Sequence, residues 1–126
     1  MIRGTGIDLV QIERIRRAQS RNGGAFIQKG FTLKEQEYAE SGPDPAVRYA
    51  GLYAVKEAVY KAVAPNTAAH DFDIRLVETG HRPDGSPYVI VNERLQAVLD
   101  EAGIRRLHIS ITDEGEYAAA FAVAEG

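Results

Sequence analysis

The sequence contains no cysteine among its 126 residues. That absence excludes a disulfide framework, a zinc site built on thiolates and a cysteine nucleophile. Any catalytic metal must therefore be bound by carboxylates or histidines.

The sequence also lacks a long apolar run. A membrane-spanning helix needs roughly 20 consecutive apolar residues, and no window approaches that length. Near the start, Arg3 and Asp8 interrupt the apolar stretch that a secretory signal would need. We therefore expect a soluble, cytoplasmic protein without a membrane partner.

Length and composition indicate one globular domain spanning residues 1–126. A chain of this size buries a real core but is too small to enclose a complex ligand site without help. With 44% hydrophobic and 26% charged residues, the composition indicates neither disorder nor a fibrous repeat.

Charge is distributed unevenly along the chain. The net charge is −3, yet the first 30 residues have only Asp8 and Glu13 as acidic side chains. The basic residues in this part are Arg3, Arg14, Arg16, Arg17, Arg21 and Lys29. This asymmetry favours an acidic protein partner over a nucleic acid.

Apolar periodicity and turn residues predict an α+β fold. We expect helices over residues 11–21, 33–40, 45–64 and 92–102, with Thr32 and Glu35 forming a capping box before the second. We expect strands over residues 2–10, 72–78, 88–91, 107–112 and 117–124, the last two as a hairpin. This order predicts a mostly antiparallel sheet packed against the long core helix at 45–64.

Asp8 is unusual because it lies near the end of an apolar strand, beside Ile7 and Leu9. A carboxylate there is costly to bury unless it is paired or bound to a cation. The alternatives are that Asp8 caps the following helix or forms an ordinary salt bridge.

Glu57 and Lys61 lie four residues apart on the long helix and so share one face. Such a pair is usually a surface ion pair worth roughly 0.2–0.5 kcal/mol. Here, however, the pair lies beside Ala54 and Ala58, whose small side chains allow another element to approach closely. If the first strand ends near this point, Asp8 and Glu57 can share one Mg²⁺. Lys61 would then supply a positive charge for a phosphate.

Several short motifs follow one another in an order that resembles a known family. They are Gly6-Ile7-Asp8, Glu13-Arg14-Ile15, Phe31-Thr32 with Glu35, Lys56-Glu57-Ala58 with Lys61-Ala62, Gly85 with Pro87-Tyr88, and His108-Ile109-Ser110-Ile111-Thr112 ahead of Tyr117-Ala118-Ala119-Ala120. Together they resemble the holo-acyl-carrier-protein synthases, the short class of 4′-phosphopantetheinyl transferases. The resemblance covers nearly the whole chain.

The resemblance implies a reaction and a set of site residues. The phosphopantetheine arm of coenzyme A would be transferred to a serine of an acyl carrier protein or carrier domain of fatty-acid or polyketide synthesis, releasing 3′,5′-ADP. Asp8 and Glu57 would bind Mg²⁺, and Lys61 would contact the phosphates. These three residues are the predicted catalytic set. The base that accepts the serine proton would be Glu57, a water on the metal or a carboxylate of the partner.

The resemblance also implies which residues contact coenzyme A. Lys56 and the turn containing Gly85 and Pro87 would lie near the nucleotide end. His108 and Ser110 match the strand that lines the coenzyme A pocket, although alternation alone would make them the polar side of a hairpin.

The family's assembly and partner are implied in the same way. The family acts as a homotrimer with active sites between subunits, which would supply the help that a small domain needs. Arg14, Arg17 and Arg21 would contact an acidic helix of the carrier protein. For Arg16 and Arg21 a solvated helix face is the alternative.

Two positions depart from the family pattern. Leu52 precedes Tyr53 where many members have arginine, and Asp113 stands where histidine is common. One contact to coenzyme A or the carrier would then be absent or supplied by Arg48. Neither change touches Asp8 or Glu57.

Two other functions fit parts of the sequence. One is a non-catalytic module whose basic first helix binds an acidic protein or a nucleic acid, and whose binding would not depend on Glu57 or Mg²⁺. The other is a different metal-dependent nucleotide enzyme that uses the same pair of carboxylates.

Overall fold

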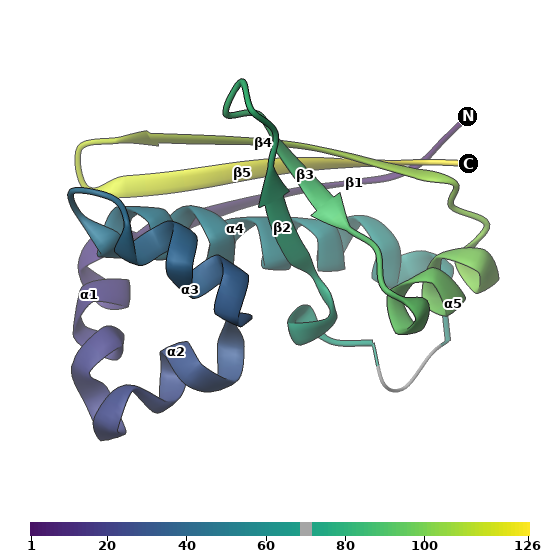
Figure 1. The fold of residues 1–126 in the computed structure, drawn as a ribbon. Helices are drawn as coiled ribbons and strands as arrows, with labels where there is room; N and C mark the ends of the chain where they lie inside the picture. The colour runs from purple at the N-terminus through teal and green to yellow at the C-terminus, as the bar shows by residue number, and fades with distance from the viewer. Residues whose placement is uncertain (69–71) are drawn as a thin grey trace.

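A three-stranded antiparallel sheet forms the centre of the computed structural model, which describes residues 1–68 and 72–126 (Figure 1). The central strand β5 (Tyr117–Glu125) lies between β1 (Ile2–Gln11) and β4 (Arg106–Glu114). β4 and β5 are the predicted C-terminal hairpin. The first and last strands of the chain are therefore direct neighbours.

One face of this sheet packs on the long helix α4 (Pro45–Val63). The packing is close because the facing side chains are small: Ala118, Ala120, Ala122 and Ala124 of β5 are all buried. On β1, a Cβ atom added to Gly6 would lie 1.9 Å from the backbone oxygen of Ala58. Glycine at this position thus allows β1 to touch the backbone of α4.

The opposite face of the sheet is open. Ile7 and Leu9 of β1 are each 65% exposed, and Phe121 of β5 is 44% exposed. Strand pairing places Ser110 opposite Phe121 and His108 opposite Val123, so both polar residues share this open face.

The remaining elements pack around α4. Near its start lie α1 (Ile12–Ser20), the 3₁₀ turn η1 (Arg21–Gly24), α2 (Ala25–Gly30) and α3 (Leu33–Glu40) (Figure 1). After α4 the chain forms η2 (Ala64–Asn66), η3 (Ile74–Leu76), the hairpin of β2 (Glu78–His81) and β3 (Pro87–Ile90), and α5 (Glu93–Ala102); the hairpin crosses the middle of α4 (Figure 1). No helix in residues 1–68 or 72–126 has both the length and the apolar character needed to cross a membrane.

Local signals predicted some elements well and others badly. The capping box is present, with Thr32 and Glu35 each accepting a hydrogen bond from the other's backbone, and α3 has the predicted bounds. The predicted strand at 72–78 is wrong, because the Asp73 side chain accepts from the backbone N–H of Arg75 and closes a 3₁₀ turn. Helix α2 was not anticipated.

Candidate active site

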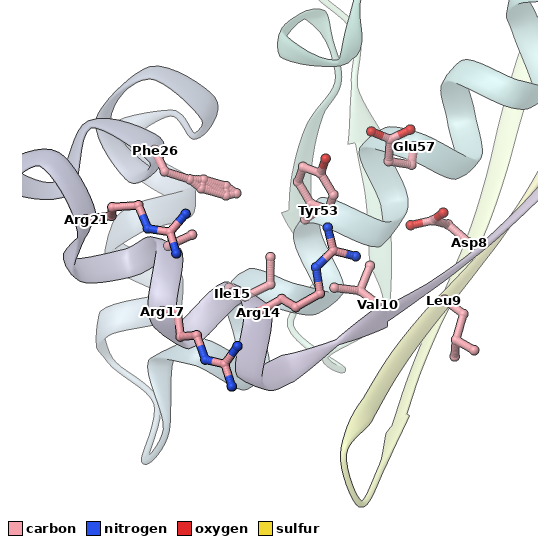
Figure 2. Close-up of a pocket in the computed structure, with 11 residues that line it drawn as sticks. Asp8, Leu9, Val10, Arg14, Ile15, Arg17, Arg21, Phe26, Tyr53 and Glu57 are labelled. Atoms are coloured by element: carbon pink, nitrogen blue, oxygen red, sulfur yellow. The ribbon is translucent and has the colours of Figure 1, made fainter.

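A cavity of about 510 Å³ lies where β1 and α1 meet α4. Its lining has an acidic part, formed by Asp8 and Glu57, and a basic part, formed by Arg14, Arg17 and Arg21 (Figure 2). The rest of the lining is apolar or aromatic and consists of Leu9, Val10, Ile15, Ala18, Phe26 and Tyr53. One cavity thus contains both predicted metal ligands and all three predicted carrier-binding arginines.

Asp8 sits on the α4 side of β1, where it pairs across the sheet with Ala120. Its Oδ1 lies 3.3 Å from Nζ of Lys61, and the same ammonium donates to the backbone oxygen of Ile7 at 3.0 Å. The helix-cap alternative is wrong, because the strand continues to Gln11 and the N-cap of α1 has no side-chain hydrogen bond. Asp8 is instead held beside α4 by a lysine that is half exposed.

Glu57 lies on α4 one turn before Lys61 and is only partly exposed. Tyr53, one turn earlier, has its pKa raised mainly by burial and then by the negative charges of Glu57 and Asp8. The tyrosine ring therefore lies within electrostatic reach of both carboxylates. Figure 2 shows the two carboxylates at the same end of the cavity.

This pair of carboxylates suits a hard divalent cation. Mg²⁺ binds oxygen ligands, commonly takes one or two carboxylates from the protein, and completes its shell with waters and substrate phosphates. Within the described part of the chain, no group of three or more His, Asp or Glu side chains forms a cage for a metal. Asp8 and Glu57 thus fit Mg²⁺ shared with a phosphate ligand better than a closed structural metal site.

The arginines of α1 and η1 divide into two sets. Arg16 is committed to Asp44 through two hydrogen bonds of 2.9 and 3.0 Å, which tie α1 to the start of α4. This pairing lowers the pKa of the Asp44 carboxyl. By contrast, Arg14 and Arg21 form no salt bridge with any residue in the described ranges, and Arg17 has only a 3.9 Å contact with Glu13. The charges that face the cavity are the ones left available for a partner.

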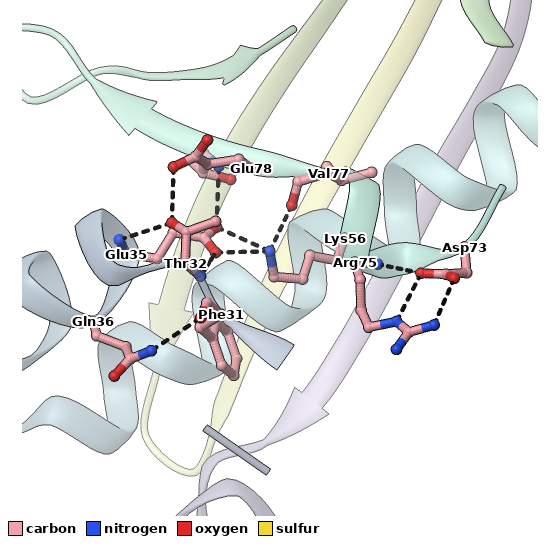
Figure 3. Close-up of polar contacts among 10 residues, drawn as sticks. Phe31, Thr32, Glu35, Gln36, Lys56, Asp73, Arg75, Val77 and Glu78 are labelled. Carbon is pink, nitrogen blue, oxygen red and sulfur yellow. Dashed lines mark hydrogen bonds and ion pairs between the residues drawn. The ribbon is translucent and has the colours of Figure 1, made fainter. Parts of the chain in front are cut away.

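The prediction for Lys56 is wrong. Its side chain is only 1% exposed, and Nζ lies 2.9 Å from each carboxylate oxygen of Glu35 while also donating to the backbone oxygen of Val77 (Figure 3). Burial lowers the pKa of Lys56, and the charge of Glu35 partly offsets that effect. All three donors of the ammonium have acceptors inside the protein, so Lys56 is not available to coenzyme A.

The other predicted coenzyme contacts lie away from the cavity in a single chain. Gly85 has φ +90° at the tip of the β2–β3 turn, a conformation that favours glycine, and Pro87 begins β3. His108 and Ser110 are on the open face of the sheet, and Nε2 of His108 is 2.9 Å from Oε1 of Glu125. One chain therefore does not bring these four residues together with Asp8 and Glu57.

The structure shows where the two residues that depart from the family pattern lie, and what Arg48 contacts. Leu52 is buried in the core at 1% exposure. Arg48 donates to the backbone oxygen of Tyr38 and to Ser41, and its guanidinium stacks on the Tyr38 ring. The guanidinium of Arg48 thus forms its contacts with the C-terminal end of α3. Asp113 is exposed on β4.

Comparison of the sequence with known protein families finds one family that matches most of the chain. Residues 4–122 match the family described as the 4′-phosphopantetheinyl transferase superfamily. The chain belongs to this family. It is similar to a holo-[acyl-carrier-protein] synthase of Azoarcus sp. strain BH72, with 38% identity over 99% of this chain and 98% of the relative.

Solved structures of family members share the fold. The holo-[acyl-carrier-protein] synthase of Neisseria meningitidis is 30% identical, covers both chains completely and has a TM-score of 0.80. That of Bacillus anthracis, solved in complex with CoA (3′,5′-ADP), is 27% identical over 99% of this chain and 97% of that chain, with a TM-score of 0.77. The predicted family and α+β fold are confirmed.

Two aromatic residues that the motifs did not predict also line the cavity of this phosphopantetheinyl transferase chain. Tyr53 and Phe26 form part of the cavity wall, and their rings pack edge to face at 5.7 Å. Tyr53 lies one helical turn before Glu57. Helical spacing alone could therefore have predicted that Tyr53 is near the site. Phe26 lies on the unexpected helix α2, so its place at the site had no comparable signal.

Proposed function

We propose that this chain transfers the 4′-phosphopantetheine arm of coenzyme A to a serine of an apo acyl carrier protein, releasing 3′,5′-ADP in a Mg²⁺-dependent reaction. The observation that carries the proposal is that Asp8 and Glu57, from distant parts of the sequence, line one cavity, with Lys61 paired to Asp8. The names of the family relatives and the coenzyme A complex of one of them support the choice of substrates.

The roles of the residues follow from their charge and position. Asp8 and Glu57 would hold Mg²⁺, which when bound offsets negative charge on the diphosphate of coenzyme A. Lys61 supplies a second positive charge for the same phosphates, because its ammonium is half exposed beside Asp8.

The reaction is an in-line displacement at phosphorus. The serine Oγ of the carrier forms a bond to the β-phosphorus of coenzyme A, the bond from that phosphorus to the bridging oxygen breaks, and 3′,5′-ADP leaves with that oxygen. Glu57, a water on the metal or a carboxylate of the partner would accept the serine proton as the new bond forms. Positioning and charge stabilisation supply most of the catalysis in such transfers.

The carrier protein would dock on the basic part of the cavity. Arg14, Arg17 and Arg21 lie on its edge and carry charge that a neighbouring acidic helix can match (Figure 2). Complementary charges of this kind mainly steer encounter and fix the register of the two proteins.

The proposal includes a single domain over residues 1–126 that assembles as a homotrimer with active sites between subunits. The open sheet face supports the assembly, because it exposes the large apolar side chains of Ile7, Leu9 and Phe121. Exposed apolar patches of this kind often mark protein–protein interfaces. His108 and Ser110 lie on that face, so a neighbouring copy would be the one to use them. The turn with Gly85 and Pro87 would contact the nucleotide end of coenzyme A.

Mass spectrometry of the carrier tests the reaction. The protein is incubated with coenzyme A, Mg²⁺ and a panel of apo-carriers from fatty-acid and polyketide systems, with each carrier's serine-to-alanine variant as the control. We expect one carrier to gain the mass of phosphopantetheine on its serine and the control to gain nothing. Carrier binding without a mass gain would favour the non-catalytic module, and no coenzyme A binding would favour another nucleotide enzyme.

A further inference from the structure

A buried ion pair lies directly beside the metal-binding residue on α4. The side chains of Lys56 and Glu35 are 1% and 0% exposed, and Lys56 immediately precedes Glu57 in the sequence. The proposed reaction uses neither residue.

The Glu35 carboxylate is the centre of a network that joins three elements (Figure 3). Its Oε1 accepts from the backbone N–H of Thr32 at 3.0 Å, and its Oε2 accepts from the backbone N–H of Thr79 at 3.0 Å. Lys56 bonds both oxygens and also the backbone oxygen of Val77. The network thus ties α3, α4 and the start of the β2–β3 hairpin to one another.

A further hydrogen bond ties the N-cap of α3 to β2. The hydroxyl of Thr32 donates to Oε2 of Glu78 at 2.7 Å. Three consecutive residues of the segment entering β2, which are Val77, Glu78 and Thr79, are therefore held by side chains or caps of α3 and α4.

The hairpin is held in place by contacts outside its own ladder, and β3 also packs beside β4. β2 and β3 form a two-stranded sheet whose ladder is separate from the three-stranded sheet. A hairpin of two strands is only marginally stable by itself. Stacking of Tyr38 on His81, with ring centroids 3.9 Å apart, fixes the far end of β2, and the Glu35–Lys56 network fixes its beginning.

Stability alone is a poor explanation for this network. Burying two charges costs free energy that their attraction only partly recovers, and apolar residues of similar size often stabilise a protein equally well. A charged pair keeps all its hydrogen bonds only when the elements that supply its partners have one particular arrangement. Such a pair therefore fixes the relative positions of these elements.

We infer that Glu35 and Lys56 are positioning residues that set the β2–β3 hairpin relative to the turn of α4 that carries Glu57. This inference rests on the proposed function, since it assigns the hairpin turn with Gly85 and Pro87 to coenzyme A and Glu57 to the metal. The turn lies away from the cavity of its own chain, so in the proposed trimer it would present the nucleotide end of coenzyme A to Asp8 and Glu57 of a neighbouring copy. The placement of the hairpin on α3 and α4 would then set where the diphosphate lies.

The double variant Glu35→Gln/Lys56→Met tests the inference. It removes both charges together, so neither is left buried alone, and it keeps similar side-chain volumes. The glutamine amide has one acceptor oxygen where the carboxylate has two, so Thr32 N–H and Thr79 N–H can no longer both be bonded. Arg16→Met/Asp44→Asn is the matched control, because it removes another ion pair that joins two elements but does not contact the hairpin.

Three measurements are made on each protein: KM for coenzyme A, KM for the carrier, and hydrogen exchange at the Thr79 amide. Because a misplacement of about 1 Å costs up to about 10²-fold in such sites, we expect KM for coenzyme A to rise by at least about 10-fold in the double variant. KM for the carrier should change by less than about twofold, since Arg14 and Arg17 are untouched, and the Thr79 amide should exchange faster. The control should show none of these changes.

The inference is overturned if KM for coenzyme A stays within about twofold of the unmodified protein, or if both KM values rise equally. A purely structural role would lower the active fraction and leave both KM values unchanged. If the double variant does not fold, Glu78→Ala takes its place, because it removes the acceptor of the Thr32 hydroxyl and a negative charge near Lys56 while the Glu35–Lys56 pair stays intact. An unchanged KM for coenzyme A in that variant would overturn the role of the network in placing β2. Failure of the unmodified protein to transfer phosphopantetheine would count against the proposed function, whereas hydrogen exchange at Thr79 still tests the anchor.

Discussion

Replacing Gly6 with alanine should push β1 away from α4 and separate Asp8 from Glu57. The new Cβ would lie 1.9 Å from the backbone oxygen of Ala58 and 2.8 Å from its carbonyl carbon. Ordinary van der Waals contact begins at 3.4 Å, so the oxygen contact must lengthen by about 1.5 Å. Both atoms belong to the backbone of a long helix, so a side-chain rotation cannot relieve the clash.

The cost follows from that displacement. Overpacking a core typically destabilises a protein by about 1–3 kcal/mol, and a backbone clash belongs at the upper end. We expect the melting temperature to fall by roughly 10 °C. Because Asp8 lies two residues after Gly6 on the same strand, we also expect kcat/KM for transfer to fall by about 10²-fold or more.

Gly30→Ala is the control for this prediction. A Cβ there would meet nothing within 4 Å. Both variants are compared by thermal melting and by the rate of carrier modification. A Gly6→Ala protein that keeps both the melting temperature and the rate of the unmodified protein would refute the close packing of β1 on α4 as the device that brings the two carboxylates together.

Further substitutions separate the roles of individual residues. Arg14→Ala should raise KM for the carrier by about 2- to 5-fold at low salt and by less at high salt. Arg16→Ala should leave this KM unchanged, because Arg16 is already paired with Asp44. Steady-state kinetics at two ionic strengths measures both effects. Lys61→Met should lower kcat on the order of 10²-fold with little change in melting temperature, because Lys61 is half exposed and its partner Asp8 remains; an unchanged kcat would remove Lys61 from the catalytic set. Phe121→Lys should convert a trimer to monomers in sedimentation experiments and abolish transfer, and a monomeric, fully active variant would contradict sites shared between subunits.

Much of the fold is encoded in local signals. The capping box predicted the bounds of α3, and the long apolar arc before Pro65 predicted α4 to within one residue of its end. These predictions succeeded because a cap or a proline acts within one turn of the residue that carries it.

The errors arise where a local pattern competes with another contact. Phe72, Ile74 and Leu76 alternate as in a strand, but the side chain of Asp73 bonds the backbone of Arg75 and favours a turn. Phe26 lies on α2, and a helix of six residues is too short to produce a clear apolar period.

The candidate site shows the same limit. Asp8 and Glu57 were placed together from their residue types and spacing along two elements, and one cavity holds both. Lys56 was assigned to coenzyme A because the family resemblance implied it, but its acceptors come from Glu35 and Val77, each 21 residues away in the sequence. Pairing of that kind depends on tertiary structure, which neighbouring residues do not reveal.

Binding of a divalent cation tests the central claim most directly. Mn²⁺, which can be followed by electron paramagnetic resonance, replaces Mg²⁺ and is titrated into the protein with coenzyme A present. We expect one ion per active site, and either Asp8→Asn or Glu57→Gln should weaken its binding by about 10-fold or more, whereas Asp113→Asn, an exposed carboxylate on β4, should not. Undiminished binding in either Asp8→Asn or Glu57→Gln would contradict a metal shared by the two carboxylates.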